Sequence, residues 1–175
     1  SLNIGVNGIL IGSSSDLHIR GIHNMTLVNN AWSHMGILSG ANLYYDDVDK
    51  DIKHNYGEYG INDVNELDEY GIITIDVDHI KMNSGYPAII APESIEIKNT
   101  IIEGIETIDS EGNSIIPEIN SIVTAGTLTL NNSKVTTRSG GVTYNGEGFE
   151  SSLLAKKIEI INGSEVRTTA ILDAI

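Results

Sequence analysis

The sequence predicts an all-β fold, a parallel β-helix in which short strands coil and stack as a solenoid of about six irregular rungs. Three observations predict it. The chain repeats a short alternating strand motif, 29 of its 175 residues are isoleucine, and Gly and β-branched residues interrupt every longer helical pattern. A β-sandwich is the alternative, and antiparallel hairpins would favour it. The length indicates one domain that covers residues 1–175.

The repeated motif is an alternating apolar pair followed by asparagine and a small residue. It occurs as "SIEIKNT" at 94–100, "TLTLNNS" at 127–133 and "KIEIING" at 157–163. Strict alternation places apolar residues on one face of each strand, so that each strand is half-buried against its neighbours. Aligning the first apolar residue of each unit gives one column, with the segment 79–83 competing for its third place: Leu17, Leu43, Ile73, Ile95, Leu128 and Ile158. A later strand in each of the last three units is expected to begin at Ile101, Val135 and Val166.

The recurring asparagines mark a turn. If Asn99, Asn132 and Asn162 follow equivalent strands, they stack at one corner of the solenoid. Asn tolerates the left-handed backbone conformation, and its amide can bond to the amide of the neighbouring unit. We therefore interpret this position as structural rather than catalytic, the alternative being three unrelated surface turns.

Composition excludes several classes of partner and site. The chain has 24 acidic and 10 basic residues and a formal net charge of −14, which would repel a polyanion, so no nucleic acid partner is expected. With no cysteine, neither a disulfide framework nor a thiolate metal site can form. No apolar run approaches the roughly 20 residues of a membrane span, so membrane insertion is not expected. The start lacks the features of a signal peptide. Because the chain begins and ends in the middle of strand-like text, we interpret it as a mature or excised portion.

The segment 44–70 departs from the repeats and is predicted to be an acidic, Tyr-rich loop excursion from the solenoid. Aromatic side chains can stack on sugar rings. The carbohydrate-binding candidates are Trp32, Tyr44, Tyr45, Tyr56 and Tyr59. Trp32 has an equally plausible structural role, since a lone indole can fill the end of a solenoid, and the loop has the alternative of being merely solvated.

The same loop has the oxygen-ligand spacing of a calcium site. Counting from Asp47, carboxylate and amide residues occupy positions 1, 3, 5, 9 and 12 of an EF-hand-like loop. They are Asp47, Asp49, Asp51, Asn55 and Glu58. Ile52 stands where that loop has glycine, and no helix is expected to flank it, so a solvated acidic loop is the alternative. Calcium is the one cofactor that the sequence suggests.

Three units of the chain resemble the right-handed β-helix repeats of Gram-positive surface proteins, which include a carbohydrate-binding group related in fold to pectate lyases. The units are "GYPAIIAPESIEIKNTIIEG", "NSIVTAGTLTLNNSKVTTRSG" and "SSLLAKKIEIINGSEVRTTA". The resemblance implies a right-handed coil in a secreted or cell-surface bacterial module, with polysaccharide or a host-surface glycan as its partner. It covers residues 72–170 well and the first 70 loosely.

The function expected from this resemblance is non-enzymatic: polysaccharide binding or adhesion. Asp46 and Asp47 form an acidic pair, but the Gly-His-Gly and Arg-Ile-Lys motifs of polygalacturonase-like enzymes are missing, and no catalytic residue is assigned. Three arginines, Arg20, Arg138 and Arg167, are interpreted as solvated residues on strand faces. The alternatives are a polysaccharide lyase-like enzyme, degenerate or active, and a purely structural stalk.

Overall fold

The structure is a computed structural model, and its described part is all-β. It describes residues 1–6, 10–29, 36–40, 43–46, 51–54, 70–83, 87–108, 110–115, 119–138, 140–144 and 147–169. These residues form twenty strands and no helix. The all-β prediction is therefore confirmed for the part of the chain that the structure describes.

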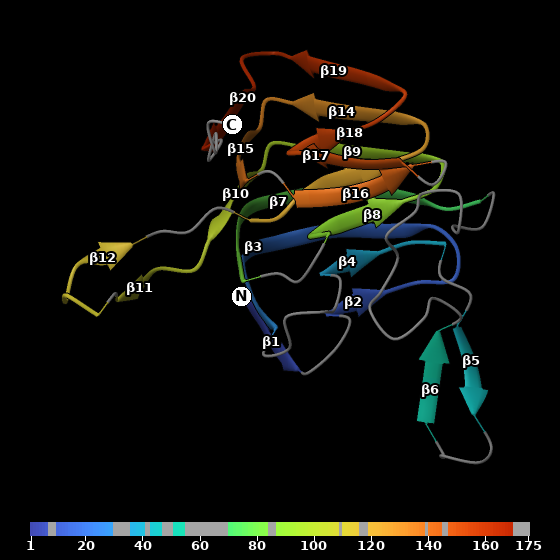
Figure 1. Ribbon diagram of the computed structural model, residues 1–175, viewed down its shortest axis with the longest axis horizontal. Coiled ribbons are helices and arrows are strands. Elements are labelled where there is room, and N and C mark those ends of the chain that lie inside the picture. The colour runs from blue at the N-terminus through green and yellow to red at the C-terminus, as the bar shows by residue number, and fades with distance from the viewer. Residues whose placement is uncertain are drawn as a thin grey trace.

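A nine-stranded sheet, called here the large sheet, dominates the molecule (Figure 1). Its hydrogen-bonded order is β19-β14-β9-β7-β10-β15-β20, and β3 joins it beside β7 with β1 beyond. Every pairing in it is parallel. The strands are β1 (Leu2–Val6), β3 (Leu17–Asn29), β7 (Ile72–Asn83), β9 (Ser94–Lys98), β10 (Ile101–Gly104), β14 (Thr127–Asn131), β15 (Lys134–Arg138), β19 (Lys157–Ile161) and β20 (Glu165–Thr169).

A second sheet, called the small sheet, has five short strands in the order β18-β13-β8-β4-β2. All four of its pairings are parallel. Its strands are β2 (Ile11–Gly12), β4 (Ile37–Leu38), β8 (Ile89–Ala91), β13 (Ile122–Thr124) and β18 (Leu153–Leu154). Since the strands of both main sheets pair in parallel, the β-sandwich alternative does not describe this core.

Antiparallel pairing occurs, within the described residues, in three hairpins. They are β5 (Leu43–Asp46) with β6 (Asp51–His54), β11 (Thr107–Ile108) with β12 (Ser114–Ile115), and β16 (Gly140–Tyr144) with β17 (Glu147–Ser151). Figure 1 shows β5–β6 and β11–β12 projecting from the stacked strands. The hairpins are therefore excursions between the parallel strands.

The strands recur along the chain as triplets, each contributing one strand to the small sheet and then two to the large sheet. The three regular triplets are β8-β9-β10, β13-β14-β15 and β18-β19-β20. Figure 1 shows β9, β14 and β19 as successive layers. This arrangement is consistent with a β-solenoid.

The register confirms most of the column predicted from the motif. Ile95 pairs with Leu128 and Leu128 with Ile158, while Ile73 pairs with both Leu17 and Ile95. Leu43 was expected in this column and is not there, because it pairs with His54 in the β5–β6 hairpin instead. The segment 79–83 does not replace Ile73 either, since both belong to β7.

The later strand begins at Ile101 in the first of these triplets, as expected, but at Lys134 and Glu165 in the other two, one residue before the expected Val135 and Val166. Val135 pairs with Ile102, whereas Ile101 pairs with Lys134. Ile102 is fully buried and Ile101 is exposed. A one-residue shift of a strand moves its inward side chains to the outer face. Ile102, and not Ile101, is therefore the residue of β10 that corresponds to Val135 and Val166 on the core face.

The core consists of inward-facing aliphatic side chains from both sheets. In β9 and β14 every second residue is buried, as the strict alternation predicts. All three residues of β8 and of β13 are buried. Burying each Val, Leu or Ile side chain contributes about 1.5–3 kcal/mol. Buried residues of the successive triplets belong to one hydrophobic cluster.

Candidate functional site

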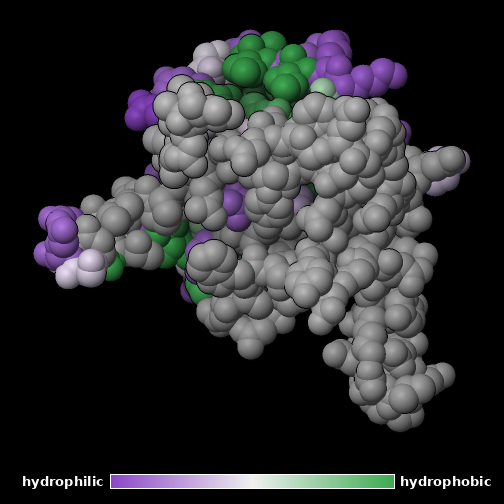
Figure 2. Space-filling model, viewed as in Figure 1, coloured by the Kyte–Doolittle hydropathy of each residue, from purple (hydrophilic) through white to green (hydrophobic). Residues whose placement is uncertain are grey.

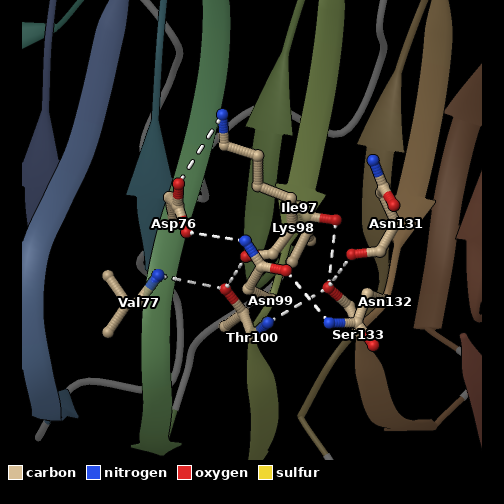
Figure 3. Close-up of polar contacts among 9 residues, drawn as sticks. All are labelled: Asp76, Val77, Ile97, Lys98, Asn99, Thr100, Asn131, Asn132 and Ser133. Carbon is tan, nitrogen blue, oxygen red and sulfur yellow. Dashed lines mark hydrogen bonds and ion pairs between the residues drawn. The ribbon is translucent and has the colours of Figure 1, made fainter. Parts of the chain in front are cut away.

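The predicted asparagine corner exists. Asn99, Asn132 and Asn162 have φ angles of 53°, 50° and 53° and are the positive-φ non-glycine residues of the described chain. The Asn132 side-chain amide donates to Oδ1 of Asn99 at 3.0 Å, and the Asn99 amide donates to Oδ1 of Asp76 at 3.2 Å (Figure 3). The last link differs from the expectation, because Asn162 donates to Oδ1 of Asn131 at 2.8 Å rather than to Asn132.

A second ladder, made of hydroxyl groups, lies next to the asparagines and was not predicted. Each hydroxyl accepts from a backbone N–H of the preceding layer, from Val77 to Thr100 at 3.2 Å, from Thr100 to Ser133 at 3.2 Å and from Ser133 to Ser164 at 3.0 Å. Thr100 and Ser133 are buried (Figure 3). The residue after Asn99 and the residue after Asn132 thus each satisfy a backbone N–H of the preceding layer.

In the last triplet this role falls to Ser164 rather than to Gly163. Lys134 pairs with Glu165, so that Ser133 corresponds to Ser164 and Gly163 is an inserted residue with φ of 76°. The side-chain amides and hydroxyls at this corner are bonded within the fold. The corner is therefore a structural element.

A shallow hollow lies on the outer face of β10, β15 and β20. It has a volume of about 160 Å³ and is lined by the buried Val135 and by outward-facing residues of the three strands: Ile101, Glu103, Lys134, Thr136, Glu165 and Arg167. Small-molecule pockets usually measure about 300–1,000 Å³. The hollow could therefore hold only part of a larger ligand, such as one residue of a polymer.

Glu103 forms one edge of this face. Its Oε1 lies 2.9 Å from Nε2 of His79 and 3.7 Å from Nζ of Lys81, both on β7. The parallel register creates this cluster, because His79 pairs with Ile101 and Lys81 pairs with Glu103. One carboxylate thus lies beside two groups that can carry positive charge.

Glu165 forms a second, similar cluster on β20. Its Oε1 lies 3.3 Å from Nζ of Lys134, and its Oε2 lies 3.7 Å from Nη2 of Arg167. These distances exceed those of short charge-assisted bonds, and Arg167 is 80% exposed. Such exposed pairs contribute little to stability, so their donors can exchange partners readily.

The face is locally cationic in a strongly acidic chain. Three of the ten basic residues, Lys81, Lys134 and Arg167, lie on it with two carboxylates, Glu103 and Glu165, for a formal charge of about +1. Hydroxyl and carboxylate groups of a ligand could bind to this mixture of donors and acceptors. We call these five residues and His79 the polar face.

The sequence could have identified the polar face through its columns. Aligning 101–104, 134–138 and 165–169 by their buried residues places Glu103, Thr136 and Arg167 in one row. The residues of this row are not among the sequence-based candidates, because the sequence signal for carbohydrate binding came from the aromatic residues of 44–70 and Trp32. Arg167 had been interpreted as a solvated strand-face residue, and its high exposure agrees with that interpretation.

The carbohydrate-binding candidates fall mostly outside the described residues. Trp32, Tyr56 and Tyr59 lie outside them, and Tyr44 and Tyr45 belong to β5, where they pair with Lys53 and Ile52. The described end of the loop segment is Tyr70, which is 73% exposed.

Most of the predicted calcium ligands also lie outside the described residues. Asp47, Asp49, Asn55 and Glu58 are outside them, and Asp51 begins β6, where it pairs with Asp46. Within the part of the chain that the structure describes, no group of three or more His, Asp or Glu side chains is placed to hold a metal ion. The calcium site therefore stays a prediction.

No helix in the described ranges is long and apolar enough to cross a lipid bilayer. Comparison of the chain with protein-family models, with curated proteins and with solved structures finds no match.

Proposed function

We propose that this chain is a non-enzymatic, extracellular module of a bacterial surface protein, folded as a right-handed parallel β-helix of about six rungs, and that it binds polysaccharide. The polar face on β7, β10, β15 and β20 carries this proposal. The likeness of three sequence units to β-helix repeats of Gram-positive surface proteins supports the location and the handedness.

The geometry of the polar face favours a polymer over a small molecule. Parallel strands present side chains at about 4.8 Å intervals, so polar side chains of neighbouring strands lie side by side across the face. Lys134 and Arg167 lie on neighbouring strands in this arrangement. A chain of sugar residues can place one hydroxyl or carboxylate group against each of them, while the hollow of about 160 Å³ accepts one ring.

A glycan array probed with the full chain and with a Lys134→Ala/Arg167→Ala variant tests the proposal. The wild-type protein should bind a defined set of polysaccharides, and the double variant should bind them at least tenfold more weakly. Lys98→Ala is the matched control, because Lys98 is also a surface cation, paired with Asp76 at 3.6 Å on a different part of the large sheet. A silent array, or equal loss in the control, would refute binding at this face.

A structural stalk is the second candidate, and the bonded corner favours it. The amide and hydroxyl ladders join successive layers without leaving the corner residues available for a ligand. A stalk predicts no binding by any glycan, so the same array separates the two functions.

Calcium binding by Asp47, Asp49, Asp51, Asn55 and Glu58 is proposed separately from glycan binding. Calorimetric titration of the full chain with calcium should give saturable heat that Asp49→Ala removes. Equal heat from both proteins would show that the ion binds elsewhere, and no heat would show that the loop binds none.

A further inference from the structure

An apolar area is exposed at the end of the stack formed by β18, β19 and β20. Ile158, Ile160 and Ile161 are 43%, 49% and 43% exposed, and we call these three residues the end patch. Figure 2 shows a hydrophobic area between hydrophilic ones at the side of the molecule where Figure 1 shows β19. Three branched aliphatic side chains exposed on one strand are unusual enough to indicate an interaction surface.

Two of these residues continue columns that are buried everywhere else in the regular triplets. Ile158 follows Ile95 and Leu128, and Ile160 follows Ile97 and Leu130. The four earlier residues are 0–1% exposed. The alternation of β19 is therefore that of an interior strand, although the described chain covers only one of its two edges.

One edge of β19 has no described strand hydrogen-bonded to it. Within the described residues β19 pairs with β14 alone and β20 with β15 alone. An uncovered strand edge presents alternate N–H and C=O groups to any segment that can add to the sheet. The edges of β19 and β20 lie together at one end.

We propose that this end is an acceptor for a polypeptide segment that has the chain's own repeat pattern and adds as a further parallel layer. Continuity of the existing interface identifies the occupant. The edge of β9 receives β14, and the edge of β14 receives β19, in the same register each time. A segment that adds to β19 in this register places its apolar pair over Ile158 and Ile160 and its asparagine over Asn162.

The polar residues of β19 are compatible with the same occupant. Lys157 and Glu159 face outward and form an ion pair of 2.7 Å, and Thr129 of the neighbouring strand donates to Glu159 at 3.4 Å. A threonine in the added strand can make the same contact with Glu159 from the other side. The segment 122–138 of this chain has threonines at these outward positions and leucines at the inward ones.

A second copy joined head to tail fits less well. The first described strand, β1, pairs only with Met25–Asn29, the second half of β3. That end is consequently stepped by one layer, whereas all three strands of the last triplet lie in one layer. If the two ends stacked, β20 could pair with β1, but a gap of one strand would separate β18 from β2 and β19 from β3.

Fluorescence anisotropy with a labelled synthetic peptide of residues 122–138 tests the proposal. The peptide should bind the full chain saturably, and Ile160→Lys and Ile160→Thr should each weaken binding at least tenfold. Ile108→Lys is the matched control, since Ile108 is 68% exposed on the β11–β12 hairpin, and it should leave binding unchanged. A peptide with Leu128→Asp and Leu130→Asp should not bind.

Hydrogen exchange of the backbone amides locates the bound peptide on the protein. The bound peptide should slow the exchange of backbone amides in β18, β19 and β20, and leave those of β11 and β12 unchanged. Absence of binding, or equal binding by Ile160→Thr and wild type, overturns the proposal. A third outcome would also overturn the proposal: the protein self-associates, Ile160→Lys abolishes the self-association, and excess peptide does not inhibit it. The end patch would then bind a second copy of the chain.

Discussion

The triplet β13-β14-β15 and the triplet β18-β19-β20 have nearly the same sequence pattern and very different surroundings. Leu128 and Leu130 are 0% exposed, whereas their counterparts Ile158 and Ile160 are 43% and 49% exposed. The first triplet has a neighbour on each side, and the second has one described neighbour. In a stacked repeat protein, burial therefore depends on the adjacent unit as much as on the residue itself.

The largest difference is expected for truncation of the core column. Leu128→Ala should lower the free energy of unfolding by about 2–5 kcal/mol, because it leaves a cavity between two layers. Ile158→Ala should cost about 1 kcal/mol or less, since that side chain is already partly in water. Denaturant unfolding of both variants measures the difference, and equal losses would show that the end patch is covered in solution.

Removing a hydroxyl of the second ladder should also lower the free energy of unfolding more in the interior triplet than in the last one, by a smaller amount. Ser133→Ala removes the acceptor of the buried Thr100 N–H and should cost about 1–3 kcal/mol. Ser164→Ala removes the acceptor of the Ser133 N–H at a more accessible site, where water can substitute, and should cost about half as much. Thermal unfolding compares the two, with Ser152→Ala as a control outside the ladder.

Thr137→Val should stabilise the interior triplet by up to about 1 kcal/mol. The Thr137 hydroxyl is buried and has no hydrogen-bond partner among the described residues. Valine has nearly the same shape and removes the cost of burying an unpaired polar atom. Its counterpart Thr168 is exposed and bonded to Ser152 at 2.6 Å, so Thr168→Val should give no gain in the same unfolding measurement.

The smallest effect concerns the ion pair of Lys157 and Glu159 on β19, which stand where β14 has Thr127 and Thr129. The hydrogen bond from Lys157, reinforced by its positive charge, lowers the pKa of Glu159 below its ordinary value. Because the folded pKa is the lower one, the stabilisation is present above the unfolded pKa and disappears as the pH falls through the folded pKa. In a Lys157→Met variant the pKa should rise toward the ordinary value.

Carboxyl resonances followed by NMR across the acid range would measure this pKa. Lys134→Met, which removes a cation paired with Glu165 rather than Glu159, serves as the control. An unchanged Glu159 titration in Lys157→Met would mean that the ion pair does not form in solution.

Much of the fold followed from the sequence because its determinants are local. Alternation of apolar and polar residues over five positions predicted β9, β14 and β19 and their inward residues. Asparagine is one of the few residues that tolerate positive φ, so three of them in equivalent places predicted the corner.

The tertiary structure decided the features that depend on residues brought together by stacking. Leu43 has the same alternating pattern as the column but pairs in a hairpin, since local pattern does not specify the partner strand. The polar face exists because register places Lys134 beside Glu165 and His79 beside Glu103, from strands 31 and 24 residues apart in sequence. The exposure of Ile160 depends on whether a further layer covers it, which no property of the isoleucine itself determines.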